Sequence, residues 1–342
     1  MEKKLFIGID FSKKTFDVSV VHLSNLQSEV YQQFENSKEG CLALFQWLKT
    51  LSQEDFDSWL FCGEHTGLYS VCLSEFLVKQ GLFIWLENPL QIKQSIGIKR
   101  GKNDRLDSHD IVFYAYRFRD KARAWSLPEK ALKSLELLLA FRARLLSNKH
   151  TLSVSSSEIR RVMQRNTTVR YIYEQSKKDI ERINKEIKEV EKQMLEQIER
   201  YETLRENYEL VSSIKGVALI NTSAILVATR NFTRFENSRQ FACYAGLAPF
   251  AKQSGTSIHT KPRVSRLANK NIKVLLTQAA KSARIHDPNI RQYYERKLAE
   301  GKEEWLITNN IKNKLIHRIF AVVRNKQLYQ VNYINLSNKA IV

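Results

Sequence analysis

The chain has 342 residues, of which 43% are hydrophobic, so a sizeable core is available and global disorder is excluded. Its formal net charge is +19, and residues 206–342 alone carry 22 lysines and arginines against 8 acidic residues. Because neutralising phosphates releases condensed counterions, nucleic acid is the natural partner, with a merely soluble basic surface as the alternative. The four cysteines form no C-x-x-C pair, no signal-peptide cleavage site is visible, and no apolar run reaches membrane-spanning length. We therefore expect a reducing, cytoplasmic location, with no zinc site, disulfide or membrane contact.

The first hundred residues alternate the patterns of strands and helices. Short apolar or alternating runs predict five strands, at Leu5–Ile9, Thr15–Leu23, Ser28–Phe34, Trp59–Cys62 and Leu82–Leu86. Amphipathic stretches predict helices at Leu42–Leu51, with a cap at Asn36-Ser37, and at about Thr66–Gln80. Three antiparallel strands followed by parallel crossovers are typical of a mixed sheet with helices on both faces. We expect an α/β domain over residues 1–127.

Four carboxylates occupy positions where this sheet would end or meet a helix. Asp10 ends the first strand, and Glu64 follows the fourth strand, which in such a sheet can lie beside the first. Asp104 and Asp107 open a helical stretch, and their spacing of three places both on one helix face. Each has a simpler explanation, as a strand end, a helix cap or a partner of the helix dipole.

Taken together within a strongly basic chain, these carboxylates predict a divalent-metal site. Clustered hard oxygen ligands suit Mg²⁺, with Mn²⁺ as the alternative ion. Two such ions about 3.5–4 Å apart can clamp the attacking and leaving oxygens of a phosphoryl transfer. The interpretation requires Asp10 and Glu64 to share a face of the sheet, close to the helix that bears Asp104.

The middle of the chain, residues 128–208, has the pattern of a coiled coil. No glycine occurs between Pro128 and Tyr208, and helix-forming residues dominate. Apolar residues recur at alternating spacings of three and four, with charged residues between them. The seam comprises Ile180, Ile183, Ile187, Val190 and Met194, continued less regularly by Ile198, Tyr201 and Leu204. A hairpin with Leu132–His150 and a contact between two chains both satisfy this pattern.

Residues 209–342 predict a mostly α-helical domain. Leu210–Thr229 has the pattern of two helices around Gly216, either a phosphate-binding helix-hairpin-helix or an ordinary packing unit. A loop is expected from Ala245 through Ser257, followed by a basic helix over about Ser265–Arg284. Near the C-terminus, aromatic and basic residues can contact nucleic acid, although burial in amphipathic helices is the simpler interpretation. These residues are Tyr293, Tyr294, Trp305, Arg318 and Arg324.

Several segments resemble the ordered blocks of a known family. The segments IGIDFSKKTFDVSVV, GEHTGLYS and KNDRLDSHDIVFYAY resemble the three acidic blocks of the DEDD transposases of the insertion-sequence one-ten family, which includes the Piv-type site-specific invertases. The segments FACYAGLAPFAKQSGTSI and KPRVSRLANKNIKVLLTQAAKSA are similar to the C-terminal transposase block of that family. The resemblance covers essentially the whole chain.

This resemblance implies a fold and a chemistry. It implies a ribonuclease H-like N-terminal domain, similar to Holliday-junction resolvases, with its metal ligands at Asp10, Glu64, Asp104 and Asp107. It also implies a serine nucleophile that joins to DNA, and the matching position is Ser254. From the residues alone, Ser257 competes for this role, and Ser254-Gly255 can equally be a turn. One departure is Ala268, where the family usually has a glycine for a turn or a close approach.

The family further implies a set of partners. Its members act on double-stranded donor and target DNA in bacterial or archaeal cells. They use a structured non-coding guide RNA, the bridge RNA. They act as homo-oligomers, with sites assembled from the metal domain of one subunit and the serine block of another. Two other functions fit the residues: a hydrolytic nuclease of the junction-resolvase type, and a non-catalytic nucleic-acid-binding relative.

Overall fold

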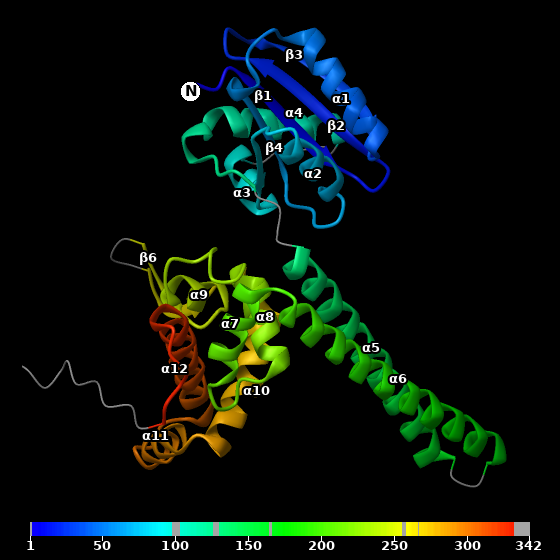
Figure 1. Cartoon of the computed structure of the whole chain (residues 1–342), viewed down its shortest axis with the longest axis vertical. Coiled ribbons are helices and arrows are strands. Elements are labelled where there is room, and N and C mark those ends of the chain that lie inside the picture. The colour runs from blue at the N-terminus through cyan, green and yellow to red at the C-terminus, as the bar shows by residue number, and fades with distance from the viewer. Residues whose placement is uncertain are drawn as a thin grey trace, which may run out of the picture. The chain divides into compact units, whose positions relative to one another are not determined.

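The computed structural model describes residues 2–97, 103–125, 130–163, 166–254, 258–265 and 267–331, with the backbone alone at 250–254 and 258–263. The chain folds as two units, Met1–Leu127 and Pro128–Val342 (Figure 1). The further boundary at residue 208 stays a prediction.

The first unit contains a mixed five-stranded sheet. Its strands are β1 (Leu5–Phe11), β2 (Thr15–His22), β3 (Asn25–Glu35), β4 (Trp59–Glu64) and β5 (Ile84–Glu87). The order in the sheet is β3-β2-β1-β4-β5. The first three strands pair antiparallel, whereas β4 lies parallel to both β1 and β5. The predicted mixed sheet, with three antiparallel strands followed by parallel ones, is therefore confirmed.

Helices cover both faces of this sheet. They are α1 (Lys38–Leu51), α2 (Val71–Lys79), α3 (Pro89–Ile96) and α4 (Asp104–Arg117), with 3-10 turns at Phe56–Ser58 and Arg119–Lys121. Alternate strand residues point to opposite faces, and two separate apolar clusters result. One lies between the sheet and the pair α1 and α2, and the other lies between the sheet and the pair α3 and α4 (Figure 1).

The predicted helix boundaries differ from the structure in one place that turn chemistry explains. The expected helix at Thr66–Gln80 begins only at Val71. Gly67 has a φ of +73°, which stops a helix, and the Ser70 hydroxyl donates to the Gly67 carbonyl at 3.1 Å. Ser37 caps α1 as expected, accepting from the Gly40 amide at 3.1 Å.

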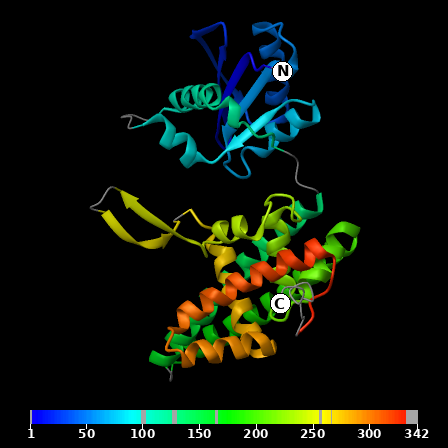
Figure 2. The same cartoon turned by 90° about the vertical axis from the view of Figure 1, so that its left-hand side faces the viewer.

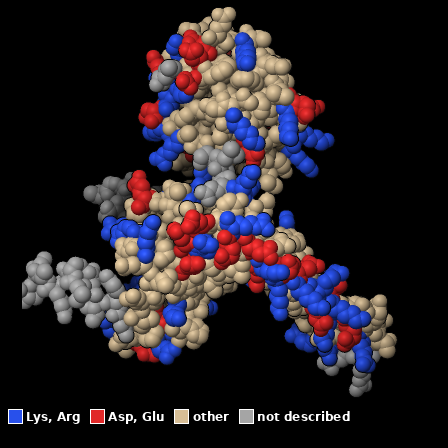
Figure 3. Space-filling model, viewed as in Figure 1, with Lys and Arg blue, Asp and Glu red and all other residues tan. Residues whose placement is uncertain are grey.

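The second unit begins with a long helical hairpin. Helices α5 (Lys130–Val162) and α6 (Thr167–Glu199) lie side by side and antiparallel (Figure 1). The predicted seam is buried in this hairpin from Ile183 to Ile198, whereas Ile180, its first residue, is only partly buried. The seam does not continue on the same helix, because α6 ends at Glu199 and Tyr201 is the N-cap of the next helix. Lysines and arginines alternate with acidic side chains along the hairpin on the face shown in Figure 3.

The remaining helices pack around one apolar core. They are α7 (Glu202–Ser212), α8 (Leu219–Thr229), α9 (Ser238–Tyr244), α10 (Lys270–His286), α11 (Pro288–Ala299) and α12 (Glu304–Asn325). The turn between α7 and α8 requires Gly216, which has a φ of +92° and whose added Cβ would lie 2.6 Å from the Ala279 carbonyl oxygen. The basic helix begins at Lys270 rather than Ser265, because the Asn269 side chain caps it.

A β-hairpin replaces part of the expected loop. Strands β6 (Pro249–Ser254) and β7 (Ile258–Val264) pair antiparallel and project from the helices as a ribbon (Figure 2). Among the helices described, none is long and apolar enough to cross a membrane.

Candidate metal centre

Asp10 lies near the C-terminal end of β1, on the face that α4 covers. Residues two apart on a strand share a face, so Gly8 points to the same side as Asp10. An added Cβ at Gly8 would come 2.3 Å from the Val112 amide nitrogen and 2.5 Å from the Ser108 carbonyl oxygen. The helix backbone therefore rests directly on β1. The Ser108 hydroxyl lies 2.9 Å from the Ser19 hydroxyl of β2, which fixes the same contact.

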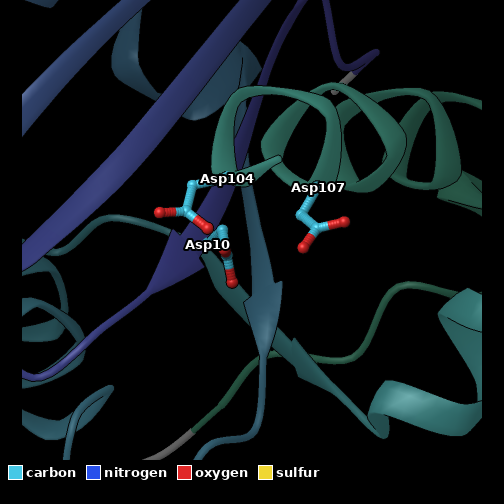
Figure 4. A group of neighbouring side chains, drawn as sticks. All are labelled: Asp10, Asp104 and Asp107. Carbon is cyan, nitrogen blue, oxygen red and sulfur yellow. The ribbon is translucent and has the colours of Figure 1, made fainter. Parts of the chain in front are cut away.

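The start of α4 brings two carboxylates to Asp10. The Asn103 side chain caps the helix by accepting from the Arg105 amide at 3.1 Å, so Asp104 and Asp107 fall in the first turn. This turn lies directly before the turn that contacts Gly8. Oxygen atoms of Asp10, Asp104 and Asp107 all lie within 4.8 Å of one another. Figure 4 shows the two helix side chains extending towards the strand end that bears Asp10.

Glu64 ends the neighbouring parallel strand. The register pairs Ile9 with Gly63, so Asp10 and Glu64 follow paired residues and face the same side of the sheet. Glu64 is outside the group of three, but it is near enough to raise the pKa of Asp10. The structure thus brings all four predicted carboxylates to one end of the sheet.

Burial and the neighbouring carboxylates both disfavour the charged form of Asp10 at this end of the sheet. The pKa of Asp10 is raised from 3.8 to about 7, first because burial penalises the charged carboxylate. The neighbouring Asp107, Glu64, Asp104 and Asp17 carboxylates raise it further, in that order. The protein therefore keeps these acids close together at a cost that a bound cation would remove.

Asp17 is a member of this acidic environment that the sequence analysis missed. It pairs with Asp10 in the β1–β2 register and is buried. Tyr31 donates a short hydrogen bond to it, which raises the pKa of Tyr31 to about 12, and Gln33 Nε2 donates at 3.1 Å. The signal was present, because the alternation that buries Phe16 and Val18 on one face places Asp17 on the other.

The residues present fit a divalent cation. Three carboxylates converge from two elements, two of them, Asp10 and Asp107, partly buried, and carboxylate oxygens are the ligands that hard cations prefer. Asp17 has a different role, because its hydrogen bonds to β3 already satisfy it. The cluster of Asp10, Asp104 and Asp107 could therefore bind a metal, with Glu64 at its edge.

The serine block lies in the second unit. Ser254 is the last residue of β6, and its backbone pairs with Ile258 of β7. The expected serine loop is therefore in part a strand, since β6 and β7 extend up to the tip of the hairpin. The side chain of Ser254 and the whole of Ser257 lie outside the described residues.

Ala268 is accommodated by a neighbouring glycine. Gly246 has a φ of +68°, and a Cβ added to it would lie 2.6 Å from the Ala268 Cβ. Ala268 itself is not among the described non-glycine residues with positive φ. The departure at residue 268 therefore causes no backbone strain at that residue, and the close approach is made possible by Gly246.

Comparisons with known proteins connect both blocks. A family model for DEDD transposases of the IS110 type matches residues 7–164, which contain all four acidic residues. A second model, for the transposase IS116/IS110/IS902 family, matches residues 208–295, which contain Ser254.

Individual relatives agree with the family models. The chain is 24% identical to the pilin gene-inverting protein of Moraxella bovis over 95% of this chain and 97% of that protein. The corresponding Moraxella lacunata protein shows the same identity and coverage. An uncharacterized 43.6 kDa protein of insertion element IS110 from Streptomyces coelicolor is 32% identical over 35% of this chain and 30% of that protein.

Fold, acidic cluster and relatives together define a transposase, an enzyme that processes DNA. The chain belongs to the IS110 family of transposases.

Proposed function

We propose that this transposase is a site-specific DNA recombinase that cuts and rejoins strands in a Mg²⁺-dependent reaction through Ser254. The observation that carries the proposal is the convergence of Asp10, Asp104 and Asp107 within 4.8 Å, with Glu64 on the adjacent strand. The pilin gene-inverting relatives are named for a DNA inversion, and inversion is a site-specific recombination.

The first unit would act as a ribonuclease H-like metal domain. Asp10, Glu64, Asp104 and Asp107 would hold Mg²⁺, or Mn²⁺ in its place. When bound, the ion supplies positive charge that neutralises and polarises the phosphodiester. Among these ligands, Asp10 would have the most firmly fixed backbone, because the close contact of Gly8 with α4 holds β1 against the helix.

Ser254 would provide the nucleophile. Its hydroxyl oxygen forms a bond to the phosphorus of one strand, and the bond from phosphorus to the departing strand oxygen breaks. The serine loses its proton and the departing oxygen gains one. The resulting phosphoserine ester conserves the bond energy for rejoining, when a new strand end reverses the same steps.

The partners proposed are double-stranded donor and target DNA, a structured guide RNA and further copies of the chain, within the cytoplasm of a bacterial or archaeal cell. The net charge of +19 supports nucleic-acid binding in general. Sequencing of RNA that copurifies with the protein tests the guide. One structured transcript from the flanking genome supports guidance, whereas random cellular RNA argues against it.

Ser254→Ala tests the serine. With purified protein, guide RNA, Mg²⁺ and labelled donor and target DNA, this variant should form neither a covalent protein–DNA adduct nor a joined product. Ser257→Ala, three residues away, is the matched control and should retain both. Cutting by Ser254→Ala at the wild-type rate would instead identify a hydrolytic nuclease that uses the carboxylates alone.

A further inference from the structure

A cavity of about 550 Å³ lies between α11 and α12, in the second unit. Its lining residues are Asn289, Ile290, Gln292, Tyr293, Arg296, Lys314 and Arg318. Three of these are cations and none is acidic. The cavity is therefore concave, polar and positively charged, and its volume falls within the range of about 300–1,000 Å³ typical of small-molecule sites.

A buried ion pair fixes the inner wall of this cavity. Asp287 is fully buried and caps α11 by accepting from the Asn289 and Ile290 amides at 2.9 and 3.1 Å. Its second oxygen accepts from Arg318 Nη1 at 2.7 Å and from the Tyr329 hydroxyl at 2.8 Å. Because four donors satisfy Asp287, it holds the Arg318 guanidinium in one orientation.

Arg318 retains donors for a ligand. A guanidinium carries five N–H donors in a planar fork, and the bond to Asp287 uses one of them. The side chain of Arg318 is 24% exposed and lines the cavity. This arrangement suits a phosphate, which accepts two parallel hydrogen bonds from an arginine fork.

Two further cations that line the cavity, Arg296 and Lys314, are exposed to solvent. Lys314 Nζ lies 4.5 Å from the centre of the Tyr293 ring, and the Arg296 guanidinium lies 5.8 Å from it. Arg296 approaches Glu300 at only 3.9 Å, with both side chains largely exposed, so this pair contributes little. Within the described part of the chain, Lys314 lies in no ion pair.

We propose that this cavity binds one unpaired nucleotide of a nucleic-acid strand, with its phosphate held by Arg296, Lys314 and Arg318. The side-chain amides of Asn289 and Gln292 offer the donors and acceptors that a base edge needs. A duplex keeps its bases stacked inside, so a cavity that receives a base requires a nucleotide that has left the stack. The site rests on the proposed function only in that the enzyme handles nucleic acid; it does not depend on the metal cluster or on Ser254.

The test uses the full-length protein in EDTA, so that the metal cluster makes no contribution. Fluorescein-labelled single-stranded RNA, single-stranded DNA of the same sequence and a blunt DNA duplex are titrated at several salt concentrations. The double variant Arg296→Gln/Lys314→Gln removes two cavity cations. Lys281→Gln/Lys302→Gln removes two exposed cations outside the cavity and is matched in charge.

The cavity variant should bind single strands about tenfold more weakly. The slope of log affinity against log salt concentration should become shallower by about 0.7 for each phosphate that the variant no longer neutralises. The control pair should shift the affinity much less. Arg318→Lys keeps the ion pair with Asp287 but loses the planar fork, so it should fold normally and also bind more weakly. Whichever single strand the wild-type protein binds more tightly, RNA or DNA, identifies the source of the nucleotide.

Three results would overturn the proposal: equal losses in the cavity and control variants, unchanged affinity in the cavity variant, or equal losses for the duplex and the single strands. Failure of the recombinase proposal would look different. In that case Ser254→Ala would leave strand joining intact, while the cavity variants would still lose single-strand binding.

Discussion

The two units of the chain divide its charge unequally. Residues 1–127 contain 16 lysines and arginines and 16 acidic residues, whereas residues 128–342 contain 39 against 20. The whole excess of +19 therefore belongs to the second unit. A divalent cation is attracted by carboxylates and a polyphosphate by cations, and intermixing the two sets in one patch would neutralise both. Under the proposed function, this division assigns the attraction of nucleic acid to the second unit and the metal-dependent chemistry to the first.

The same contrast appears in how each unit treats its buried acids. In the second unit, Asp287 is satisfied by Arg318, Tyr329 and two helix amides. In the first unit, Asp10 faces other carboxylates and its pKa is raised to about 7. The charge of Asp287 is compensated within the fold, whereas a proton or a cation would lower the cost of burying Asp10.

The largest expected effect comes from Asp10→Asn. Loss of this carboxylate should reduce strand cleavage in Mg²⁺ to below about a thousandth of the wild-type rate, since a metal ion supplies several kcal/mol of transition-state stabilisation. Nucleic-acid affinity should change less than about twofold, because the cationic unit is untouched. Cleavage assays and fluorescence titrations on the same preparation measure both.

A parallel fall in cleavage and affinity would break the comparison, since it would mean that the two units do not separate chemistry from binding. Asp120→Asn is a suitable control. This aspartate follows α4 in the 3-10 turn at Arg119–Lys121, outside the acidic group, and its loss should leave both properties intact.

Gly8→Ala should have the next largest effect. The new Cβ would meet backbone atoms of Val112 and Ser108 at 2.3–2.7 Å, so α4 must move and take Asp104 and Asp107 away from Asp10. We expect a loss of about 1–3 kcal/mol of stability from overpacking and about a hundredfold loss of cleavage. Thermal unfolding and cleavage rates measure the two effects.

The matched control is Gly63→Ala on the adjacent strand. Its Cβ would meet the Phe11 ring at 2.6 Å and the Ile9 carbonyl oxygen at 3.2 Å, on the face that α4 does not cover, so the strain does not fall on the backbone of α4. Cleavage should be lost much less than in Gly8→Ala at a similar loss of stability. Equal loss of cleavage in both variants would reduce the role of Gly8 to general packing.

Part of the metal centre follows from local sequence patterns. Strand alternation and crossover order predicted that Asp10 and Glu64 would share a sheet end, because apolar periodicity determines which residues are buried. The spacing of Asp104 and Asp107 predicted their common helix face. Strand alternation indicates the face on which Asp17 lies, but Asp17 was missed because its burial depends on Tyr31 and Gln33 from another strand.

Other features depend on tertiary packing that no local pattern encodes. The close contact of Gly8 with α4 joins residues about a hundred positions apart. The β-hairpin around Ser254 was expected as a loop, because its glycine and serine residues mark a turn but do not indicate how far the strands extend towards it. The cavity of the second unit required Asp287 to orient Arg318 from 31 positions away.

The smallest predicted effect is a pH dependence confined to the first unit. The pKa of Asp10 is about 7 in the folded protein against an ordinary value of 3.8, so the folded state binds this proton more tightly than the unfolded state. Stability of the metal-free first unit should therefore fall as pH rises from about 4 to about 7 and level off above that. Over pH 5.5 to 8 we expect a loss of about 1–2 kcal/mol, because the carboxylate is only partly buried and water screens it.

Tryptophan fluorescence can follow the first unit selectively, because Trp47, Trp59, Trp85 and Trp125 belong to it and only Trp305 belongs to the second. In EDTA, the fluorescence transition should occur at a lower temperature at pH 8 than at pH 5.5, and Asp10→Asn should remove most of this difference. Adding Mg²⁺ at pH 8 should raise the transition temperature of the wild type and leave that of Asp10→Asn nearly unchanged. At a Mg²⁺ concentration of a hundred times the dissociation constant, the gain in the free energy of unfolding should be about 2.7 kcal/mol. Transition temperatures that respond neither to pH nor to Mg²⁺ would show that the carboxylates do not repel one another. They would contradict the proposal that the acidic cluster binds a cation.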